Sequence, residues 1–144
     1  MKLKVAWVGK TREPAIQTLC EEYLKRLRRF VEAEGISLRD EDAMLQLGSR
    51  LPRHTLVLLD ERGKQFSSQE LAKFLGDYQD RNSQPLLFGV GPADGFSEEA
   101  CKSAQLVLSL GRMTLAHELA RVVLLEQLYR AFTILKGHPY HRGH

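Results

Sequence analysis

The sequence predicts an α/β fold built on a mostly parallel sheet of five or six strands, with helices on both faces. Short apolar runs alternate with helical patterns along the 144 residues, as expected for such a sheet. A composition of 43% hydrophobic and 27% charged residues is typical of a globular protein. Because no internal repeat or linker divides the chain, we expect one domain over residues 1–144.

Five apolar runs predict the strands. They are Leu3–Gly9, Ile36–Asp40, Thr55–Asp60, Pro85–Gly91 and Leu106–Leu110. The segment ERGK, which follows Asp60, predicts a turn. Pro85 stands at the first position of its run, where a missing backbone donor is tolerated.

Helical periodicity and capping residues predict the helices between these strands. The first begins at Pro14, keeps an apolar stripe to Val31 and ends at Gly35. The others are a short helix around Ala43–Leu47, a helix from Ser67 through Tyr78, a helix capped by Ser97, and a last helix over Leu115–Leu135. Ser67 and Glu70 have the spacing of a capping box.

The ends of the last helix are also indicated by single residues. Thr114 is a candidate cap, and Glu118 suits the positive end of the helix. Gly137 and Pro139 end it.

Charge and hydropathy exclude several protein classes. A net charge of +3 is too mild for a dedicated nucleic-acid coat, although KRLRR at residues 25–29 is either a solvated helix face or a phosphate contact. No apolar run approaches the ~20 residues of a membrane helix. Cys20 and Cys101 lie in helix-like patterns, so we expect two free thiols and a cytoplasmic protein.

Ligands of parallel sheets gather at the carboxyl ends of the strands, where LDERGK, GVGPADG and SLGRMT lie. GVGPADG departs from the dinucleotide spacing G-x-G-x-x-G, and Pro92 removes a backbone donor. Gly91 would let a ligand approach the backbone closely. The apolar LGRMTL is either core packing or a slot for a flat ring such as adenine.

The terminal GHPYHRGH concentrates rings and charge. His138, His141 and His144 suggest a metal site, but no cysteine or nearby carboxylate supports one, so we expect no metal. Tyr140 could stack on a base, and Arg142 could bind phosphate. The histidines could move a proton.

Four segments together resemble one family: LDERGKQFSSQELA, VGPADGFS, LARVVLLEQLYRAFTI and HPYHR. This is the bacterial large-subunit rRNA pseudouridine N3-methyltransferase family (RlmH type) of the SPOUT class. The resemblance implies S-adenosyl-L-methionine as cofactor, a C-terminal trefoil knot and a homodimer. It implies methylation of N3 of a pseudouridine in 23S rRNA, with the assembled ribosome as the substrate.

The resemblance also implies the site residues. The cofactor would be bound by Leu59, Gly91, Leu110, Gly111, Arg112, Met113, Thr114 and Leu115. The catalytic residues would be His138, Tyr140, His141 and Arg142. His138 is the first candidate for the proton acceptor and His141 the second.

The chain departs from the family pattern at two places. Pro92 replaces the second of two adjacent glycines, and residues 40–54 form a shorter stretch than is usual. These departures leave open a SPOUT methyltransferase acting on another RNA, such as a transfer RNA, or a ribosome-binding module without catalysis. The spacing of GVGPADG at residues 89–95, the glycine loop, disfavours a nucleotide-binding oxidoreductase.

Overall fold

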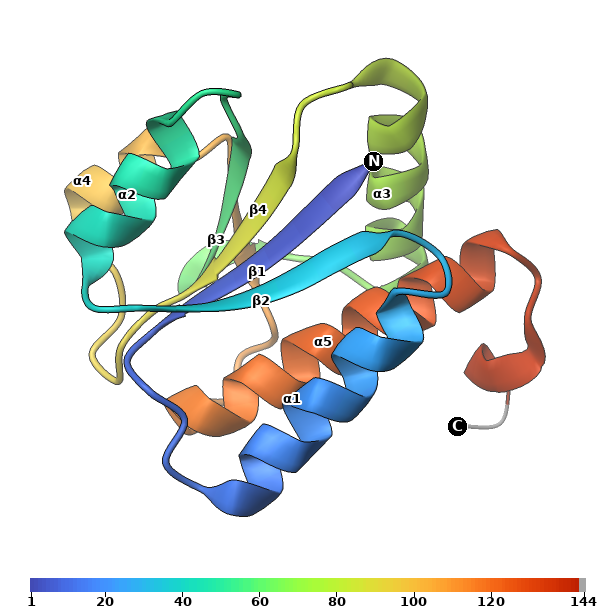
Figure 1. Cartoon of the computed structure of the whole chain (residues 1–144), viewed down its shortest axis with the longest axis horizontal. Helices are drawn as coiled ribbons and strands as arrows, with labels where there is room; N and C mark the ends of the chain where they lie inside the picture. The colour runs from blue at the N-terminus through green and yellow to red at the C-terminus, as the bar shows by residue number, and fades with distance from the viewer. Residues whose placement is uncertain (143–144) are drawn as a thin grey trace.

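The computed structural model describes residues 1–142 and contains a five-stranded parallel sheet with the order β2-β1-β4-β3-β5 (Figure 1). The strands are β1 (Lys2–Val8), β2 (Glu32–Leu38), β3 (Thr55–Gln65), β4 (Leu86–Val90) and β5 (Leu106–Ser109). The predicted α/β class and parallel sheet are therefore confirmed.

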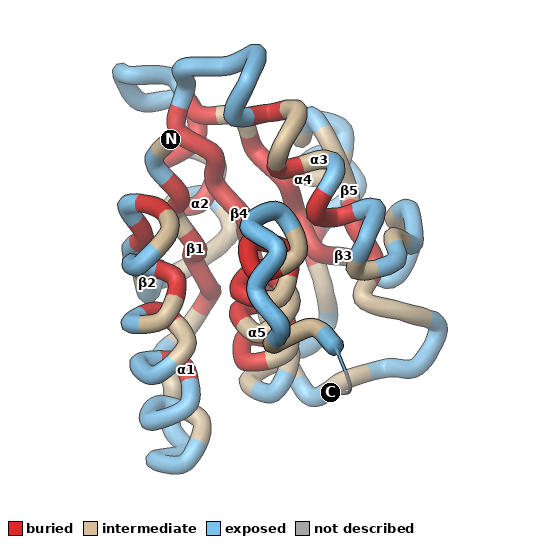
Figure 2. The backbone as a smooth tube through the Cα atoms, turned by 90° about the vertical axis from the view of Figure 1, so that its right-hand side faces the viewer, coloured by how far each residue is buried: buried red, intermediate tan, exposed pale blue. Residues whose placement is uncertain are grey.

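Helices cover both faces of the sheet, as predicted (Figure 1). They are α1 (Pro14–Leu27), α2 (Glu41–Ser49), α3 (Ser68–Arg81), α4 (Glu98–Ser103) and α5 (His117–Leu135), followed by the 3₁₀ turn η1 (Pro139–His141). Because side chains alternate along a strand, β4 sends Phe88 to the core under α1, α3 and α5 and Leu87 to the core under α2 and α4. In Figure 2 the central strand β4 is accordingly buried along its whole length.

The first helix is shorter than predicted. It ends at Leu27, and the chain turns directly into β2, where Gly35 is a strand residue instead of a helix stop. A Cβ atom at Gly35 would lie 2.8 Å from Leu24 Cδ1 and 3.0 Å from the Trp7 ring. Glycine is required here because α1 packs tightly against the sheet, which a local pattern does not reveal.

The predicted turn at ERGK is also wrong. The segment belongs to β3, which pairs with β5 again after a register shift between Leu59 and Lys64. A Cβ at Gly63 would lie 2.5 Å from the Val107 carbonyl oxygen. The second half of β3 therefore depends on a close approach between the backbones of Gly63 and Val107, which only glycine allows.

Two predicted caps are confirmed, and the cap of the last helix is not. Ser67 forms the capping box with Glu70, and Ser97 caps α4. Helix α5 instead begins after Ala116, with no side-chain cap from Thr114. Glu118 lies in the first turn of α5, as predicted. Its carboxylate accepts the backbone N–H groups of Arg12 and Glu13 at 3.0 and 3.2 Å, which ties α5 to the segment just before α1.

The strand order places the ends of β1, β4, β3 and β5 along one edge of the sheet. The connection from β5 to α5 passes at this edge before α5 packs between α1 and α3 (Figure 1). This path is consistent with the trefoil knot that the resemblance implies. No helix in residues 1–142 is long and apolar enough to cross a membrane.

Candidate functional site

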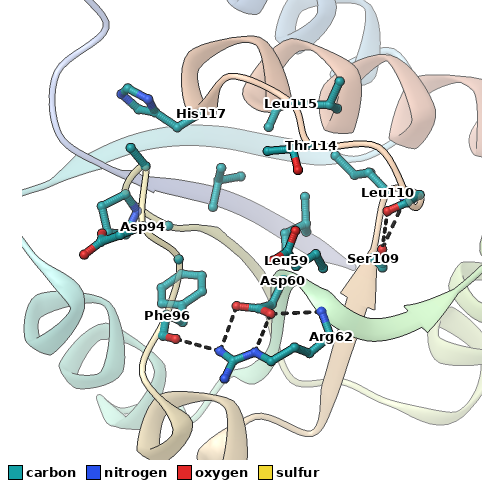
Figure 3. A pocket seen from close by; sticks show the side chains of 18 of the residues that line it. Leu59, Asp60, Arg62, Asp94, Phe96, Ser109, Leu110, Thr114, Leu115 and His117 are labelled. Atoms are coloured by element: carbon teal, nitrogen blue, oxygen red, sulfur yellow. Dashed lines mark hydrogen bonds and ion pairs between the residues drawn. The ribbon is translucent and has the colours of Figure 1, made fainter.

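A cleft of about 520 Å³ opens at the carboxyl ends of β4 and β5, beside the middle of β3 (Figure 3). Its walls are the middle of β3, the loops after β4 and β5, and the first turn of α5. This is the position at which parallel sheets bind ligands, and the volume lies within the range of small-molecule sites.

The cleft brings together all but one of the residues predicted to bind the cofactor. Its lining includes Leu59, Gly91, Leu110, Gly111, Met113, Thr114 and Leu115. Arg112 is exposed and is not among the lining residues. The side chain of Met113 is 85% exposed, so it stands at the rim and remains available to a ligand or a second chain.

Glycine shapes two walls of the cleft. Gly91 is buried, and a Cβ there would lie 3.1–3.3 Å from the Phe96 ring. Gly111 has a φ of +142°, which other residues rarely adopt. Its loop is fixed by Ser109, whose hydroxyl donates to the Gly111 carbonyl at 2.9 Å and accepts the Gly111 N–H at 3.2 Å.

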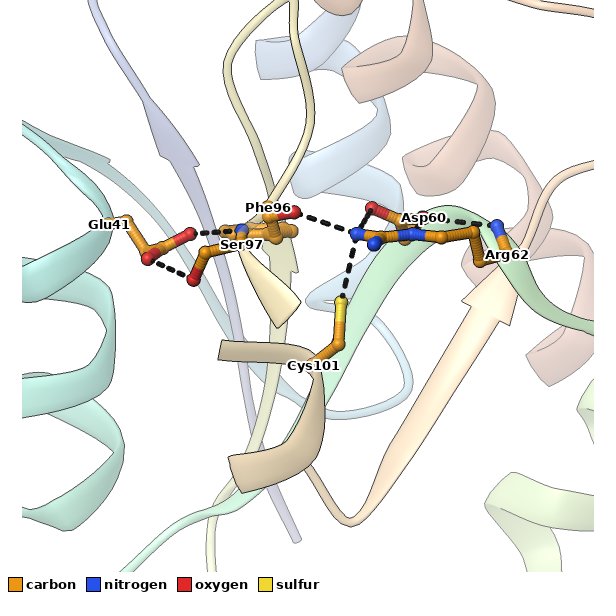
Figure 4. A network of polar contacts seen from close by, with 6 residues as sticks. All are labelled: Glu41, Asp60, Arg62, Phe96, Ser97 and Cys101. Carbon is orange, nitrogen blue, oxygen red and sulfur yellow. Dashed lines mark hydrogen bonds and ion pairs between the residues drawn. The ribbon is translucent and has the colours of Figure 1, made fainter. Parts of the chain in front are cut away.

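An ion pair lies beneath the glycine loop (Figure 4). Arg62 donates from Nε to Asp60 Oδ1 at 2.8 Å and from Nη2 to Oδ2 at 3.0 Å. Nη2 also donates to the Phe96 carbonyl at 2.7 Å. The Asp60 side chain is 4% exposed, and its hydrogen bonds with Arg62 lower the pKa of its carboxyl group.

The same network extends to the helices on the far face. Arg62 Nη2 lies 3.5 Å from Cys101 Sγ, and burial raises the pKa of this thiol. Glu41 accepts the backbone N–H and the hydroxyl of Ser97, both at 2.7 Å. Arg62 thus holds the carbonyl of Phe96, and Glu41 holds the N–H and hydroxyl of Ser97. These two charged groups fix the end of the glycine loop.

The sequence did not identify several polar residues of the cleft. Asp94 and His117 line it together with Asp60. The loop LDERGK pointed to the region, but only Leu59 was singled out there. An acidic lining suits a ligand that carries positive charge, and the apolar residues suit a flat ring.

A buried arginine supports the edge of the sheet next to the cleft. Arg121 is fully buried and donates to the Val8 carbonyl at 2.9 Å and to the Thr11 hydroxyl at 2.8 Å. It also lies over the Trp7 ring, 5.6 Å from the centroid. It therefore ties α5 to the loop after β1, and burial lowers the pKa of its guanidinium.

The C-terminal tail is folded back against α5. Gly137, with a φ of +69°, ends the helix as predicted, and the N–H of His138 donates to the Thr133 carbonyl at 2.9 Å. Tyr140 then donates its hydroxyl to Glu126 Oε2 at 2.9 Å and packs edge-on against Tyr129, with centroids 4.7 Å apart.

The predicted catalytic residues lie together in this tail, but none of them lines the cleft of their own chain. His138 and Arg142 are exposed. His141 is half-buried, and within residues 1–142 its Nδ1 atom finds no hydrogen-bond partner. His144 lies outside the described residues. Within those residues no group of three His, Cys, Asp or Glu side chains is placed to hold a metal.

The basic stretch of residues 25–29 lies at the C-terminal end of α1. Lys25 and Arg29 are exposed, whereas Arg26 pairs with Glu22 at 2.9 Å. Arg28 donates to the Ala33 carbonyl at 2.9 Å. The stretch is therefore partly structural, and Lys25, Arg28 and Arg29 are exposed to solvent.

Comparison with known proteins gives consistent results. The family model described as predicted SPOUT methyltransferase matches residues 1–141. A protein of Koribacter versatilis (strain Ellin345) named ribosomal RNA large subunit methyltransferase H is 61% identical, with all of both chains covered. A protein of the same name from Geotalea daltonii (strain DSM 22248 / JCM 15807 / FRC-32) is 46% identical over 98% of this chain and 99% of its own.

Solved structures show the same fold at low sequence identity. A probable methylase family protein of Haemophilus influenzae Rd KW20 has a TM-score of 0.61 and 11% identity, covering 96% of this chain and 69% of its own. The SpoU methyltransferase AviRb of Streptomyces viridochromogenes, solved with AdoMet, has a TM-score of 0.54 and 14% identity over 90% of this chain and 57% of its own.

Proposed function

The chain belongs to the SPOUT methyltransferase family, and from this membership we propose that it methylates N3 of a pseudouridine in 23S rRNA, with S-adenosyl-L-methionine as methyl donor. The observation that carries the proposal is the match to ribosomal RNA large subunit methyltransferase H along the whole chain. The cleft with its predicted lining supports it independently. The proposed substrate is the 23S rRNA of the assembled ribosome, and the proposed location is the cytoplasm, where Cys20 and Cys101 stay free thiols.

The residues of the cleft fit this cofactor. Leu59, Leu110 and Leu115 would hold the adenine ring, and the close backbone at Gly91 and Gly111 would supply hydrogen bonds. The acidic lining suits a sulfonium ion and an ammonium group. When bound, the cofactor supplies a methyl group that is already activated, so the protein mainly aligns the target with it.

We propose that the site is completed in a homodimer by the partner's tail. Within one chain the tail contacts Glu126, which lies nine residues after His117, or about 14 Å along the helix axis. Two α5 helices paired antiparallel across a two-fold axis would bring each tail toward the partner's cleft. The exposed leucines of α1 and α5, Leu19 and Leu119, each 42% exposed, give this pairing an apolar contact.

The tail would then accept the proton of the target nitrogen and hold the RNA base. The target nitrogen carries a proton that must leave, and the imidazole of a histidine can accept it as a general base. We propose His138 as this acceptor and His141 as the alternative. Tyr140 would hold the base, and Arg142 would bind phosphate or the oxyanion that develops on the ring. The exposed Lys25 and Arg29 would contact other RNA phosphates.

The test is methyl transfer from labelled cofactor to ribosomes of cells that lack this protein, followed by mapping of the modified base. The proposal predicts one labelled pseudouridine, in 23S rRNA. Label on transfer RNA instead would support a SPOUT enzyme for another RNA. Calorimetry with the cofactor gives no heat if the chain is a binding module without catalysis.

A further inference from the structure

We infer that Glu126 and Arg130 are positioning residues, which hold Tyr140 so that the tail presents its histidines and Arg142 in one fixed orientation. This inference rests on the proposed function of the tail and deepens it. It assigns to the Tyr140 hydroxyl an anchoring role that is separate from contact with the base.

The contacts of Tyr140 are those of an anchor. Its hydroxyl donates to Glu126 Oε2 at 2.9 Å and also hydrogen-bonds with Tyr23 of α1. Its ring packs against Tyr129, and the Arg130 guanidinium lies 5.3 Å from its centroid. Two helices and four side chains thus hold one residue of a terminal segment, and burial raises the pKa of its hydroxyl.

Glu126 is in turn fixed by Arg130. Arg130 donates from Nη2 to Glu126 Oε2 at 2.6 Å and from Nε to Oε1 at 3.3 Å. The two side chains are only 20% and 16% exposed, so water competes weakly for this pair. Because both carboxylate oxygens are engaged by one planar guanidinium, the acceptor for Tyr140 has a single orientation.

The turn before the tail shows why an anchor is needed. The chain reverses at Gly137, where the N–H groups of Gly137 and His138 donate to the carbonyls of Ile134 and Thr133 at 3.2 and 2.9 Å. Beyond this turn the chain packs back through Tyr140 and the residues of η1. His138 and Arg142 stand two residues on either side of Tyr140, so the direction in which both point depends on where that ring is held.

The anchor and the base-stacking role of Tyr140 predict different results for one variant. Tyr140→Phe keeps the ring and removes the hydroxyl. If stacking on the base is the whole role, this variant keeps its turnover. If the hydroxyl anchors the tail, kcat for ribosome methylation falls about tenfold, because a small misplacement of reacting groups is costly.

Variants of the positioning residues Glu126 and Arg130 are tested in the same assay as Tyr140→Phe. Glu126→Gln keeps a hydrogen-bond acceptor but loses the ion pair, and we expect a similar loss of kcat. Arg130→Lys keeps the charge and should recover part of the turnover that Arg130→Met loses. In all these variants Kd for the cofactor should stay within about twofold, since the cleft is untouched.

Matched controls separate anchoring from general destabilisation. Tyr78→Phe, on α3, removes a buried hydroxyl. In the parent protein this hydroxyl donates to the Gln84 carbonyl at 2.8 Å. Asp77→Asn removes the pair with Lys73 at 2.8 Å on the same helix. Both should keep kcat. NMR relaxation of the amides of residues 138–142 should show faster motion in Tyr140→Phe, Glu126→Gln and Arg130→Met, and unchanged motion in the two controls.

Two results would overturn the inference: unchanged kcat in Tyr140→Phe, or tail amides as rigid in Glu126→Gln as in the parent protein. Arg142→Ala distinguishes this failure from failure of the proposed function. If Arg142→Ala abolishes methylation while Tyr140→Phe is fully active, the tail is catalytic without this anchor. If Arg142→Ala and His138→Ala are both fully active, the tail itself has no part in the reaction.

Discussion

The guanidinium of Arg62 lies flat against the carboxylate of Asp60, with Nε 2.8 Å from Oδ1 and Nη2 3.0 Å from Oδ2, and the same Nη2 donates to the carbonyl of Phe96. This arrangement connects the middle of β3 to the glycine loop after β4. The ion pair therefore fixes the distance between two walls of the cleft.

Loss of this ion pair should weaken cofactor binding. We expect Asp60→Asn and Arg62→Met each to raise the Kd for S-adenosylmethionine by about three- to tenfold, because the glycine loop loses its charge-assisted hydrogen bonds. Calorimetry measures the change. Arg39→Met is the matched control, since it removes a pair with Asp40 whose arginine side chain is 90% exposed. Equal Kd values in all three variants would show that the loop holds its shape without Asp60.

The Asp60 pair also predicts a pH dependence of stability. The folded-state pKa of Asp60 is lowered, so its stabilising contribution is fully present above the ordinary carboxyl pKa of about 3.9 and is lost as pH falls through the lowered value. The difference in unfolding free energy between the parent protein and Asp60→Asn should be constant from pH 7 to pH 5 and shrink below about pH 4. Urea unfolding at each pH measures it. A difference that already declines between pH 7 and pH 5 contradicts the assignment.

Gly91→Ala should narrow the cleft. The added methyl would lie 3.1–3.3 Å from the Phe96 ring, so the ring must shift, at a cost of about 1–3 kcal/mol in stability. Because Phe96 belongs to the cleft wall, cofactor affinity should fall as well. Gly48→Ala is the control, since its methyl would make only ordinary contacts at 3.8–4.0 Å. Thermal unfolding should show lower stability, and calorimetry lower cofactor affinity, for Gly91→Ala than for Gly48→Ala. Equal stability and affinity in the two variants would show that the Phe96 ring moves aside without cost.

Lys25 and Arg29 should contribute a salt-dependent part of ribosome affinity. The double variant Lys25→Ala/Arg29→Ala should bind more weakly and show a shallower fall of log K with log salt, by about 0.7–0.9 for each phosphate that is no longer neutralised. Lys102→Ala, on α4 at the opposite face of the sheet, is the control. If the double variant and the control show the same slope, residues 25–29 are only a solvated helix end.

Local sequence signals were sufficient for most of the fold. The apolar runs at β1, β3, β4 and β5, and the caps at Ser67 and Ser97, depend on neighbouring residues, and the structure confirms them. The errors at Gly35 and Gly63 have a different origin. Each glycine accommodates a group distant in sequence, the Leu24 and Trp7 side chains in one case and the Val107 backbone in the other. Such contacts exist only once the chain has folded.

The candidate site shows the same division. The apolar LGRMTL segment and Gly91 pointed to a cleft, and the structure places Gly91 and every residue of the segment except Arg112 around one. The pairs Asp60–Arg62 and Glu126–Tyr140 were not foreseen, because their role depends on where Phe96 and the folded-back tail come to lie. Spacing alone gives no sign that Glu126 would accept a bond from a residue fourteen positions later.

The most direct test of a site shared between a cleft and the partner's tail is activity in a mixed dimer. One chain carries Arg142→Ala, with its cleft intact, and the other carries a cleft substitution such as Gly111→Trp, with its tail intact. Each variant alone should be inactive. If the partner supplies the tail, the mixed dimer contains one complete site and should methylate ribosomes at about half the rate of the parent dimer. A mixed dimer as inactive as either variant alone would contradict the account.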